Sequence, residues 1–202
     1  MSDVDFDAVP SLLLKYNLTD KFTVQRASEK DLPEILAIYN QSIAGKQATA
    51  DLATVTCAER EDWFNEHINS ATRPIYVVRS VTKTGESNDL TESLPIVAWG
   101  SFSDLYARTA YHISTEISIY LHQDFHGKGL GSSLTRWMLT QAADLGIHNI
   151  IALIFAHNQP SLGLFRKLGF EQWGYMPKVC DMEGFMADVV MLGKAVPSDQ
   201  GR

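Results

Sequence analysis

The sequence predicts a mixed α/β fold in which a central, mixed β-sheet is flanked by helices. Ile117, Ile119 and Leu121 alternate with polar neighbours, which is the period of two of a half-buried strand. A glycine-rich turn at 126–131 then opens a segment whose apolar residues have helical spacing. The nearly continuous apolar run 149–155 is typical of a strand covered on both faces. The second half therefore contains a strand, helix, strand, helix unit.

In the first half, strand, cap and hairpin patterns predict the elements. Ser28 is a good N-cap for the helix that follows the first strand. The polar loop 82–92 separates two apolar stretches and indicates a hairpin. The expected elements are a strand at 22–26, a helix through Leu32, Ile35, Leu36 and Tyr39, a helix at about 58–68, and strands at 75–78 and 95–102.

In the second half, glycines mark the predicted helix ends. Gly146 and Gly169 each stand where a left-handed residue closes a helix. The expected elements are a β-rich stretch at 111–121, a helix with Leu130, Leu134, Trp137, Met138 and Leu145 on its apolar face, a strand at 149–155, a helix at 160–168, and strands at 170–176 and 185–192.

The length of 202 residues fits a single domain at 21–195, preceded by an N-terminal extension at 1–20 and followed by a tail at 196–202. A net charge of -7 opposes nucleic-acid binding, which needs concentrated Lys and Arg. No apolar run is long enough to span a bilayer. The acidic start, 1–10, lacks the features of a secretion signal, so we expect a cytoplasmic protein with no membrane partner.

The cysteines and histidines show no metal-ligand spacing. Cys57 and Cys180 are far apart in the chain and belong to no CxxC motif. The six histidines form no HExxH-like cluster. We therefore expect free thiols and no metal.

The turn His126-Gly-Lys-Gly-Leu-Gly131 lies between a strand and a helix, where backbone N–H groups and the helix dipole can hold an anion. A tight turn without a ligand is the alternative interpretation. Two commoner phosphate motifs fail: Ser132 stands where a Rossmann fingerprint needs glycine, and Gly129 stands where a P-loop needs Ser or Thr.

The spacing of this turn resembles the acetyl-CoA pyrophosphate loop of the GNAT superfamily of N-acetyltransferases, with His126 in place of the usual Gln or Arg. Asn158, Ser161 and the Leu168-Gly169-Phe170 helix ending match the same superfamily, and the resemblance covers about 22–194. It implies a GNAT-type fold with acetyl-CoA as co-substrate. The cofactor-binding residues that it implies are Ile119, Tyr120, Leu121, His126, Gly127, Lys128, Gly129, Leu130, Gly131, Ser132, Asn158 and Ser161.

Within that superfamily the chain resembles the phosphinothricin acetyltransferase-like group, which acetylates the α-amine of amino acids and their analogues. The matching segments are Asp31–Asn40, Glu59-Arg60 with Trp63-Phe64, Arg108 with Ala110-Tyr111, and Glu116 with Ser118–Leu121. The resemblance also implies a homodimer and a small-molecule amine as the partner.

Acetyl transfer needs a neutral nitrogen, whereas an α-ammonium is mostly protonated near neutral pH, so a nearby base is useful. Glu116 is the candidate catalytic base, because it occupies a strand position beside the glycine turn and matches the group's carboxylate. A surface glutamate on an edge strand is the alternative. Arg108 is expected to bind the substrate carboxylate through its planar fork, with Tyr106 and Ser118 lining the same site. A solvated loop arginine is the alternative for Arg108.

Other positions depart from the family pattern or allow a second interpretation. Asn158 could cap a helix instead of contacting the pantetheine arm. Phe165 stands where the family has Tyr or His, so it is interpreted as a core residue and the general acid is unassigned. Asp181 and Glu183 make the segment before Gly184 acidic, which predicts weak acceptance of anionic side chains. The alternative functions are peptide or protein N-acetylation and a non-catalytic acetyl-CoA-binding module.

Overall fold

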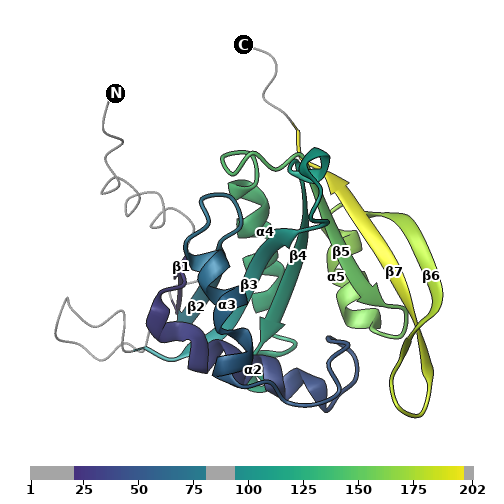
Figure 1. The fold of residues 1–202 in the computed structure, drawn as a ribbon, viewed down its shortest axis with the longest axis horizontal. Helices are drawn as coiled ribbons and strands as arrows, with labels where there is room; N and C mark the ends of the chain where they lie inside the picture. The colour runs from purple at the N-terminus through teal and green to yellow at the C-terminus, as the bar shows by residue number, and fades with distance from the viewer. Residues whose placement is uncertain (1–20, 81–93, 198–202) are drawn as a thin grey trace.

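The computed structural model describes residues 21–80 and 94–197, and its described strands form a seven-stranded sheet in the order β1-β2-β3-β4-β5-β7-β6 (Figure 1). Every neighbouring pair is antiparallel except β4 and β5, which are parallel. The strands are β1 (Phe22–Arg26), β2 (Ile75–Ser80), β3 (Ile96–Asp104), β4 (Ser114–Leu121), β5 (Asn149–Phe155), β6 (Glu171–Asp181) and β7 (Met186–Ala195). The predicted mixed sheet is confirmed.

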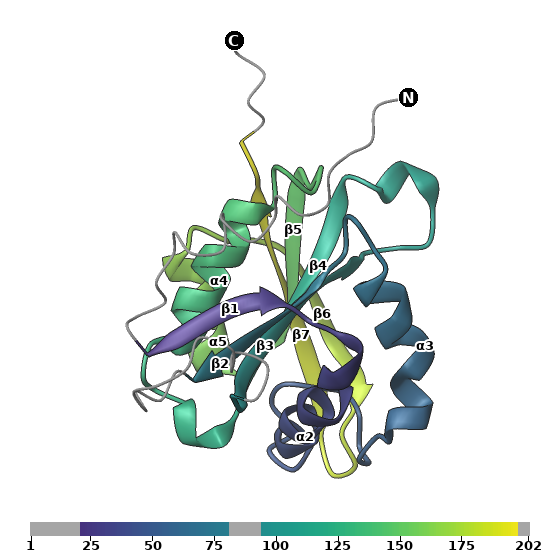
Figure 2. The same ribbon diagram turned by 90° about the vertical axis from the view of Figure 1, so that its left-hand side faces the viewer.

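Helices cover both faces of the sheet (Figure 2). Helices α2 (Leu32–Ile43) and α3 (Cys57–Ile68) cover one face, and α4 (Leu130–Gln141) and α5 (Gln159–Lys167) cover the other. Because successive strand residues point to opposite faces, Ile75 and Val77 of β2 pack under α2, whereas Tyr76 and Val78 join the core under α4 and α5. The two larger cores therefore lie on opposite faces of the sheet, as the continuous apolar strands require. A third, smaller cluster among the described residues consists of Phe155, Met182, Ala187 and Val189.

The first helical segment starts at the predicted cap, Ser28, and the second starts at Thr56, which was not predicted as a cap from the sequence. Ser28 and Asp31 form a capping box around the short 3-10 helix Glu29–Asp31, which leads directly into α2. The buried Asp31 carboxylate is paired with the buried Arg79 of β2, which fixes the start of α2 against the sheet. Thr56 caps α3 through a second capping box with Glu59. The two predicted helices of the first half are thus confirmed.

Three predicted boundaries were wrong for local reasons. The β-rich stretch expected from residue 111 begins as β4 only at Ser114, because Thr109–Tyr111 forms a 3-10 helix. The helix expected to close at Gly146 ends as regular α4 at Gln141. Turns continue from there to Gly146, which does adopt a left-handed φ of 69°. Strand β6 continues to Asp181 through a register irregularity that contains Lys178, whose φ is 51°.

The β6–β7 hairpin forms one end of the sheet and carries large exposed apolar side chains, namely Trp173, Tyr175, Val179, Phe185 and Met186. The homodimer implied by the resemblance stays a prediction. The expected loop 82–92, the extension 1–20 and most of the tail 196–202 lie outside the described residues. In the described ranges, no helix is long and apolar enough to cross a membrane.

Candidate active site

The site begins where strands β4 and β5 separate. They pair in parallel over only three positions, Ser114–Glu116 against Asn149–Ile151. Beyond Glu116, β4 stays paired with β3 as far as Leu121, while β5 stays paired with β7 as far as Phe155. The two strands diverge in Figure 1, and the backbone of β4 beyond Glu116 therefore has no described strand partner on its β5 side.

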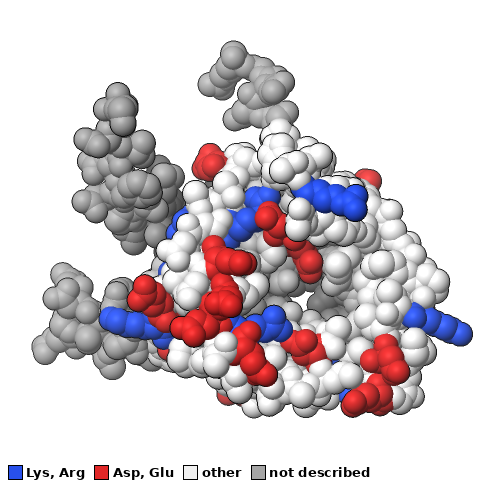
Figure 3. Space-filling model, in the orientation of Figure 1, with Lys and Arg blue, Asp and Glu red and all other residues white. Residues whose placement is uncertain are grey.

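A large cleft of about 1190 Å³ occupies this opening. Its walls come from the separated halves of β4 and β5, the glycine turn, the start of α5, and the segment between α2 and α3. The space-filling view shows a hollow in the same region, and acidic residues gather over α2 and α3 (Figure 3). Helix α3 alone carries Glu59, Glu61, Asp62 and Glu66. The surface beside the cleft on that face is therefore negative, which disfavours an acceptor with an anionic side chain.

The glycine turn has the conformation that an anion site requires. Gly127 and Gly129 have φ values of 70° and 79°, and Gly129 is the N-cap of α4. A Cβ at either glycine would meet no atom within 4 Å, so these residues are needed for their backbone angles. The N–H groups of the first turn of α4 have no intrahelical acceptor and stand at the positive end of the helix dipole.

Gly131 serves a different purpose, because it lets α4 lie close to its neighbours. A Cβ on Gly131 would be 3.3 Å from Leu164 Cδ1 and 3.5 Å from Leu121 Cδ1. The third glycine of the motif is therefore a packing requirement in the cleft wall. The three alternating glycines of this turn therefore have two different physical reasons: backbone angles at Gly127 and Gly129, and close packing at Gly131.

Other predicted cofactor residues lie in the same wall. All of the predicted set line the large cleft except Lys128, whose ammonium lies 5.4 Å from the centroid of the Phe125 ring. The His126 Nε2 atom is 3.1 Å from the Leu121 carbonyl oxygen, so this side chain ties the turn back to the end of β4.

Asn158 caps α5, which was the alternative interpretation of this residue. Its side-chain oxygen accepts a hydrogen bond from the Ser161 N–H at 3.1 Å, and its amide donates to the Gln47 carbonyl at 3.0 Å. Asn158 also lines the large cleft. Its contact with the pantetheine arm stays a prediction.

A small pocket of about 160 Å³ opens on the sheet face covered by α2 and α3. It is lined by Leu36, Tyr39, Arg60, Trp63, Trp99, Ser101, Ser103, Glu116, Ser118 and Tyr120. Four of these residues, Tyr39, Glu116, Ser118 and Tyr120, also line the large cleft. The two cavities therefore meet along these four residues, and Glu116 is the only carboxylate among them.

Glu116 has the environment expected of a base. Burial raises the pKa of its carboxyl above the ordinary value. No hydrogen bond or ion pair holds the carboxylate among the described residues, so its oxygens are available to a ligand in the small pocket. The predicted catalytic residue thus lies at the junction of the two cavities.

Four of the ten residues that line the small pocket are aromatic. Tyr120 stacks on Trp99 with centroids 4.6 Å apart, and Trp63 meets the Trp99 ring edge-on at 6.1 Å. Burial raises the pKa of Tyr120 well above its ordinary value. Trp63 and Arg60 belong to segments that matched the family in the sequence, but no local spacing showed that they would face Glu116.

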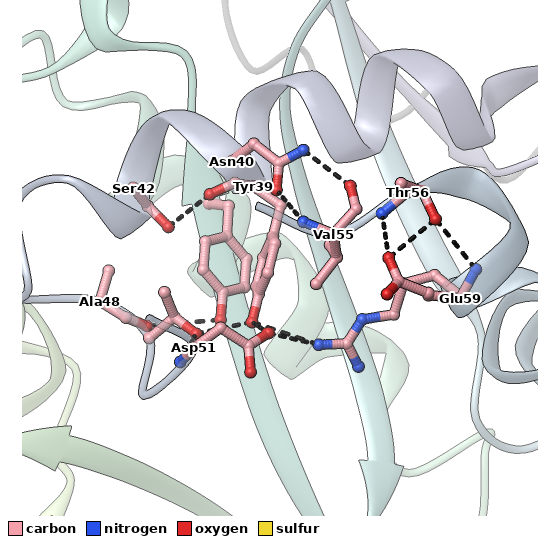
Figure 4. A network of polar contacts seen from close by, with 11 residues as sticks. Tyr39, Asn40, Ser42, Ala48, Asp51, Val55, Thr56 and Glu59 are labelled. Atoms are coloured by element: carbon pink, nitrogen blue, oxygen red, sulfur yellow. Dashed lines mark hydrogen bonds and ion pairs between the residues drawn. The ribbon is translucent and has the colours of Figure 1, made fainter. Parts of the chain in front are cut away.

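A polar network holds the segment between α2 and α3 in place (Figure 4). The Tyr39 hydroxyl donates to the Asp51 carboxylate at 2.6 Å and lies 2.6 Å from Thr49 Oγ1. Arg60 binds the same carboxylate at 2.5 Å. Because residues 47–51 line the large cleft, this network fixes one of its walls and joins it to the small pocket through Tyr39.

The structure separates several other predicted residues from the cavities. Tyr106 and Arg108 are exposed in the segment between β3 and β4 and line neither cavity. Asp181 and Glu183 also line neither cavity. Phe165 differs from these residues, because it lines the large cleft while it is buried edge-on against Phe170 at 4.9 Å, as expected of a core residue.

Neither the cysteines nor the histidines form a linked cluster among the described residues. Cys57 and Cys180 are free thiols. The described part of the chain contains no cluster of three or more His, Cys, Asp or Glu side chains that could hold a metal ion.

Known proteins are similar to this chain in sequence and in fold. The chain matches the Acetyltransferase (GNAT) family over residues 41–170. It is 40% identical over 172 residues to the Bacillus subtilis protein named "Putative phosphinothricin acetyltransferase YwnH", a match covering 85% of this chain and 98% of that protein. It is 31% identical over 170 residues to the L-methionine sulfoximine/L-methionine sulfone acetyltransferase of Pseudomonas paraeruginosa, covering 84% and 92% respectively.

A solved structure agrees with these matches. The phosphinothricin acetyltransferase (Pat) from Sinorhizobium meliloti, in complex with AcCoA, superimposes with a TM-score of 0.75 at 27% identity, covering 87% of this chain and 88% of that one. The sheet of this chain opens between two parallel strands, with the glycine turn at the opening. The chain belongs to the GNAT family and is an acetyl-CoA-dependent N-acetyltransferase, as the sequence predicted.

Proposed function

We propose that this enzyme transfers the acetyl group of acetyl-CoA to the α-amino group of an amino acid or amino-acid analogue, with Glu116 as the general base. The observation that carries the proposal is the position of Glu116, which lies where the large cleft meets the small pocket. The names of relatives that act on phosphinothricin or on methionine sulfoximine and sulfone support this class of acceptor.

In the proposed complex, acetyl-CoA lies in the large cleft. The glycine turn receives the pyrophosphate through N–H groups of Gly127–Ser132 and the start of α4. The pantetheine arm follows the unpaired side of β4 at Ile119–Leu121, with Asn158 and Ser161 on the opposite wall. The thioester then reaches the end of the cleft that Glu116 shares with the small pocket.

The reaction needs no covalent enzyme intermediate. Glu116 takes a proton from the acceptor ammonium, and the nitrogen lone pair attacks the thioester carbonyl. A backbone N–H of Ile119–Leu121 stabilises the oxyanion of the tetrahedral intermediate. Collapse of this intermediate expels CoA thiolate, which is a tolerable leaving group because thiol pKa values are near 8.5. The nitrogen loses its second proton as the amide forms, and this proton goes to the thiolate, which leaves as the CoA thiol. Buried Phe165 cannot supply a proton, and the chemistry does not require a strong acid at that place.

The acceptor lies in the small pocket, with its amine towards Glu116. A volume of about 160 Å³ suits a single amino-acid side chain better than a peptide. The walls formed by Trp63, Trp99 and Tyr120 favour a neutral or sulfur-containing side chain. We retain Arg108, with Tyr106 beside it, as the proposed carboxylate-binding element. It would have to reach the acceptor from the exposed segment before β4.

A screen that follows thiol release from acetyl-CoA tests this proposal. We expect turnover with free L-amino acids or analogues such as L-methionine sulfone, and weaker turnover with peptides that begin with the same residue. Preference for peptides over every free amino acid would favour the alternative of peptide N-acetylation. Absence of turnover with any amine, despite acetyl-CoA binding, would contradict an enzymatic role.

A further inference from the structure

The small pocket contains a hydroxyl directly across from Glu116. Ser103 of β3 and Glu116 of β4 are Cα partners in the antiparallel register, and both line the small pocket. Side chains of directly opposed residues have Cβ atoms about 4.5–5.5 Å apart on the same face of the sheet. The Ser103 hydroxyl and the Glu116 carboxylate therefore face the same small volume.

The Ser103 hydroxyl is oriented by a buried histidine. His67 of α3 has its Nδ1 atom 2.7 Å from the Trp63 carbonyl oxygen and its Nε2 atom 2.9 Å from Ser103 Oγ. Because a carbonyl oxygen can only accept, Nδ1 carries the ring hydrogen. The Nε2 atom of the neutral ring then accepts the hydroxyl hydrogen of Ser103.

The surroundings of His67 favour the neutral ring. Burial lowers the pKa of His67, against the opposing effects of the hydrogen bond to Trp63 and the charges of Glu66 and Asp104. The imidazole also packs against the Trp63 ring, with centroids 4.6 Å apart. The direction of the Ser103 hydroxyl is thus fixed by a side chain that has little freedom to move.

A serine whose hydrogen is already donated presents only oxygen lone pairs to its pocket. An ammonium group presents only N–H donors, so the two are complementary. The backbone of Ser103 is held as well, because the Thr115 hydroxyl donates to its carbonyl oxygen at 2.8 Å. The pocket therefore offers two acceptors, one neutral and one charged, on adjacent strands.

We propose that Ser103 binds the amino nitrogen of the acceptor, accepting one N–H while Glu116 receives the proton that is transferred, and that His67 is the positioning residue that holds Ser103 in its accepting state. The inference rests on the proposed function, because it takes Glu116 as the base. The proton moves to the Glu116 carboxylate, and its bonding pair stays on nitrogen as the lone pair that attacks the acetyl carbonyl. Two N–H bonds remain on the attacking nitrogen. Ser103 accepts one of them and so keeps the nitrogen in place, and the other proton is lost to the departing thiolate as the amide forms.

Calorimetry in the presence of CoA, which prevents turnover, can test the contact with L-methionine sulfone and its deamino analogue as probes. Ser103→Ala should weaken binding of the amino acid by roughly 10- to 100-fold, the range of a charge-assisted hydrogen bond. Binding of the deamino analogue should be unchanged, because it has no N–H for Ser103 to accept. Ser103→Thr keeps the hydroxyl and should bind both probes like the wild type.

Two His67 variants separate positioning from packing. Gln at this position places an acceptor where Nε2 lies, whereas Asn keeps a donor near the Trp63 carbonyl but cannot reach Ser103. We expect His67→Asn to lose amino-acid binding selectively, as Ser103→Ala does, and His67→Gln to retain most of it. Ser133→Ala and His148→Asn change the same residue types outside both cavities and should leave both probes unaffected.

The outcomes distinguish this inference from the proposed function. Failure of the wild type to acetylate any amino acid overturns both. If amino acids are acetylated and Glu116→Gln abolishes turnover, but folded Ser103→Ala binds the amino acid normally or weakens both probes equally, only the role of Ser103 is wrong. Should His67→Asn fail to fold, as thermal unfolding would show, the Ser103→Ala and Ser103→Thr pair still decides.

Discussion

The large cleft and the small pocket meet at Glu116 but are built from different parts of the chain. The large cleft depends on backbone: the left-handed glycines of the turn, the N-terminus of α4 and the unpaired side of β4. The small pocket depends on side chains, chiefly the aromatic rings of Trp63, Trp99 and Tyr120. The difference indicates that binding of acetyl-CoA requires one backbone geometry, whereas the choice of acceptor can change with single side chains.

The largest expected effect comes from Glu116, the proposed base, which is one of the four residues that line both cavities. Glu116→Gln keeps the shape of the side chain but removes the base, so kcat should fall by about 10²- to 10⁴-fold. Acetyl-CoA affinity, measured by calorimetry, should stay nearly unchanged, because the turn and the edge of β4 are intact. A matching loss of acetyl-CoA affinity would show that Glu116 belongs to the cleft rather than to the chemistry.

The next largest effect is a loss of acetyl-CoA binding. It shows whether the left-handed glycine of the cleft is needed for binding or only for stability, as any strained glycine position would be. Gly129→Val should weaken acetyl-CoA binding by at least about tenfold, because a β-branched residue strains a left-handed position and displaces the turn. Gly146→Val is a matched control, since Gly146 has a similar φ of 69° and an equally open Cβ position but lies outside both cavities. Both variants should lose thermal stability, and only the first should lose acetyl-CoA.

An intermediate effect concerns the acceptor carboxylate. Arg108→Ala should raise KM for amino acids by roughly tenfold more than for the corresponding amino-acid amides, because a charge-assisted bidentate contact is stronger than a neutral one. Steady-state kinetics on matched acids and amides provide the comparison. Equal effects on acid and amide would leave Arg108 as a solvated loop residue, as its exposure in the free chain allows.

The smallest effect is on stability. Because burial raises the pKa of Glu116, its charged form is disfavoured in the folded state, and the cost appears as pH rises from the ordinary carboxyl value near 4.3 through the raised pKa. Glu116→Gln should therefore unfold at a higher temperature than the wild type at neutral pH, by about 2–4 °C for each kcal/mol relieved. The gain should disappear at acid pH. Exposed Glu61→Gln is the control and should show no such gain.

The sequence could predict the parts of the site that have local signals. Alternation identified β4 and placed Glu116 on it, and the glycine spacing identified the turn before α4. These features depend on neighbours in the chain, so a pattern of a few residues was sufficient. The overextended helix at Gly146 shows the limit of this reasoning, because a left-handed glycine can close a series of turns as well as a regular helix.

Long-range contacts left no such signal. His67 and Ser103 are 36 residues apart, on a helix and a strand, and nothing in their spacing brings them together. The Tyr39, Asp51 and Arg60 network joins two helices through an irregular segment with no periodic pattern. Asn158 could not be interpreted from the sequence for a different reason. An asparagine at this position can cap α5 and can also line the large cleft, so its identity does not distinguish the two roles. Only the folded chain shows which groups share a cavity.

The measurement that tests the central claim most directly is the pH dependence of kcat/KM for the wild type and Glu116→Gln, with two acceptors whose amines differ in pKa. If Glu116 is the base, the wild-type rate falls as pH drops through its raised pKa, and the loss caused by the substitution shrinks at alkaline pH and with the less basic amine. A loss by the same factor at every pH and with both amines would contradict the account. In that case Glu116 positions the acceptor and the base lies elsewhere.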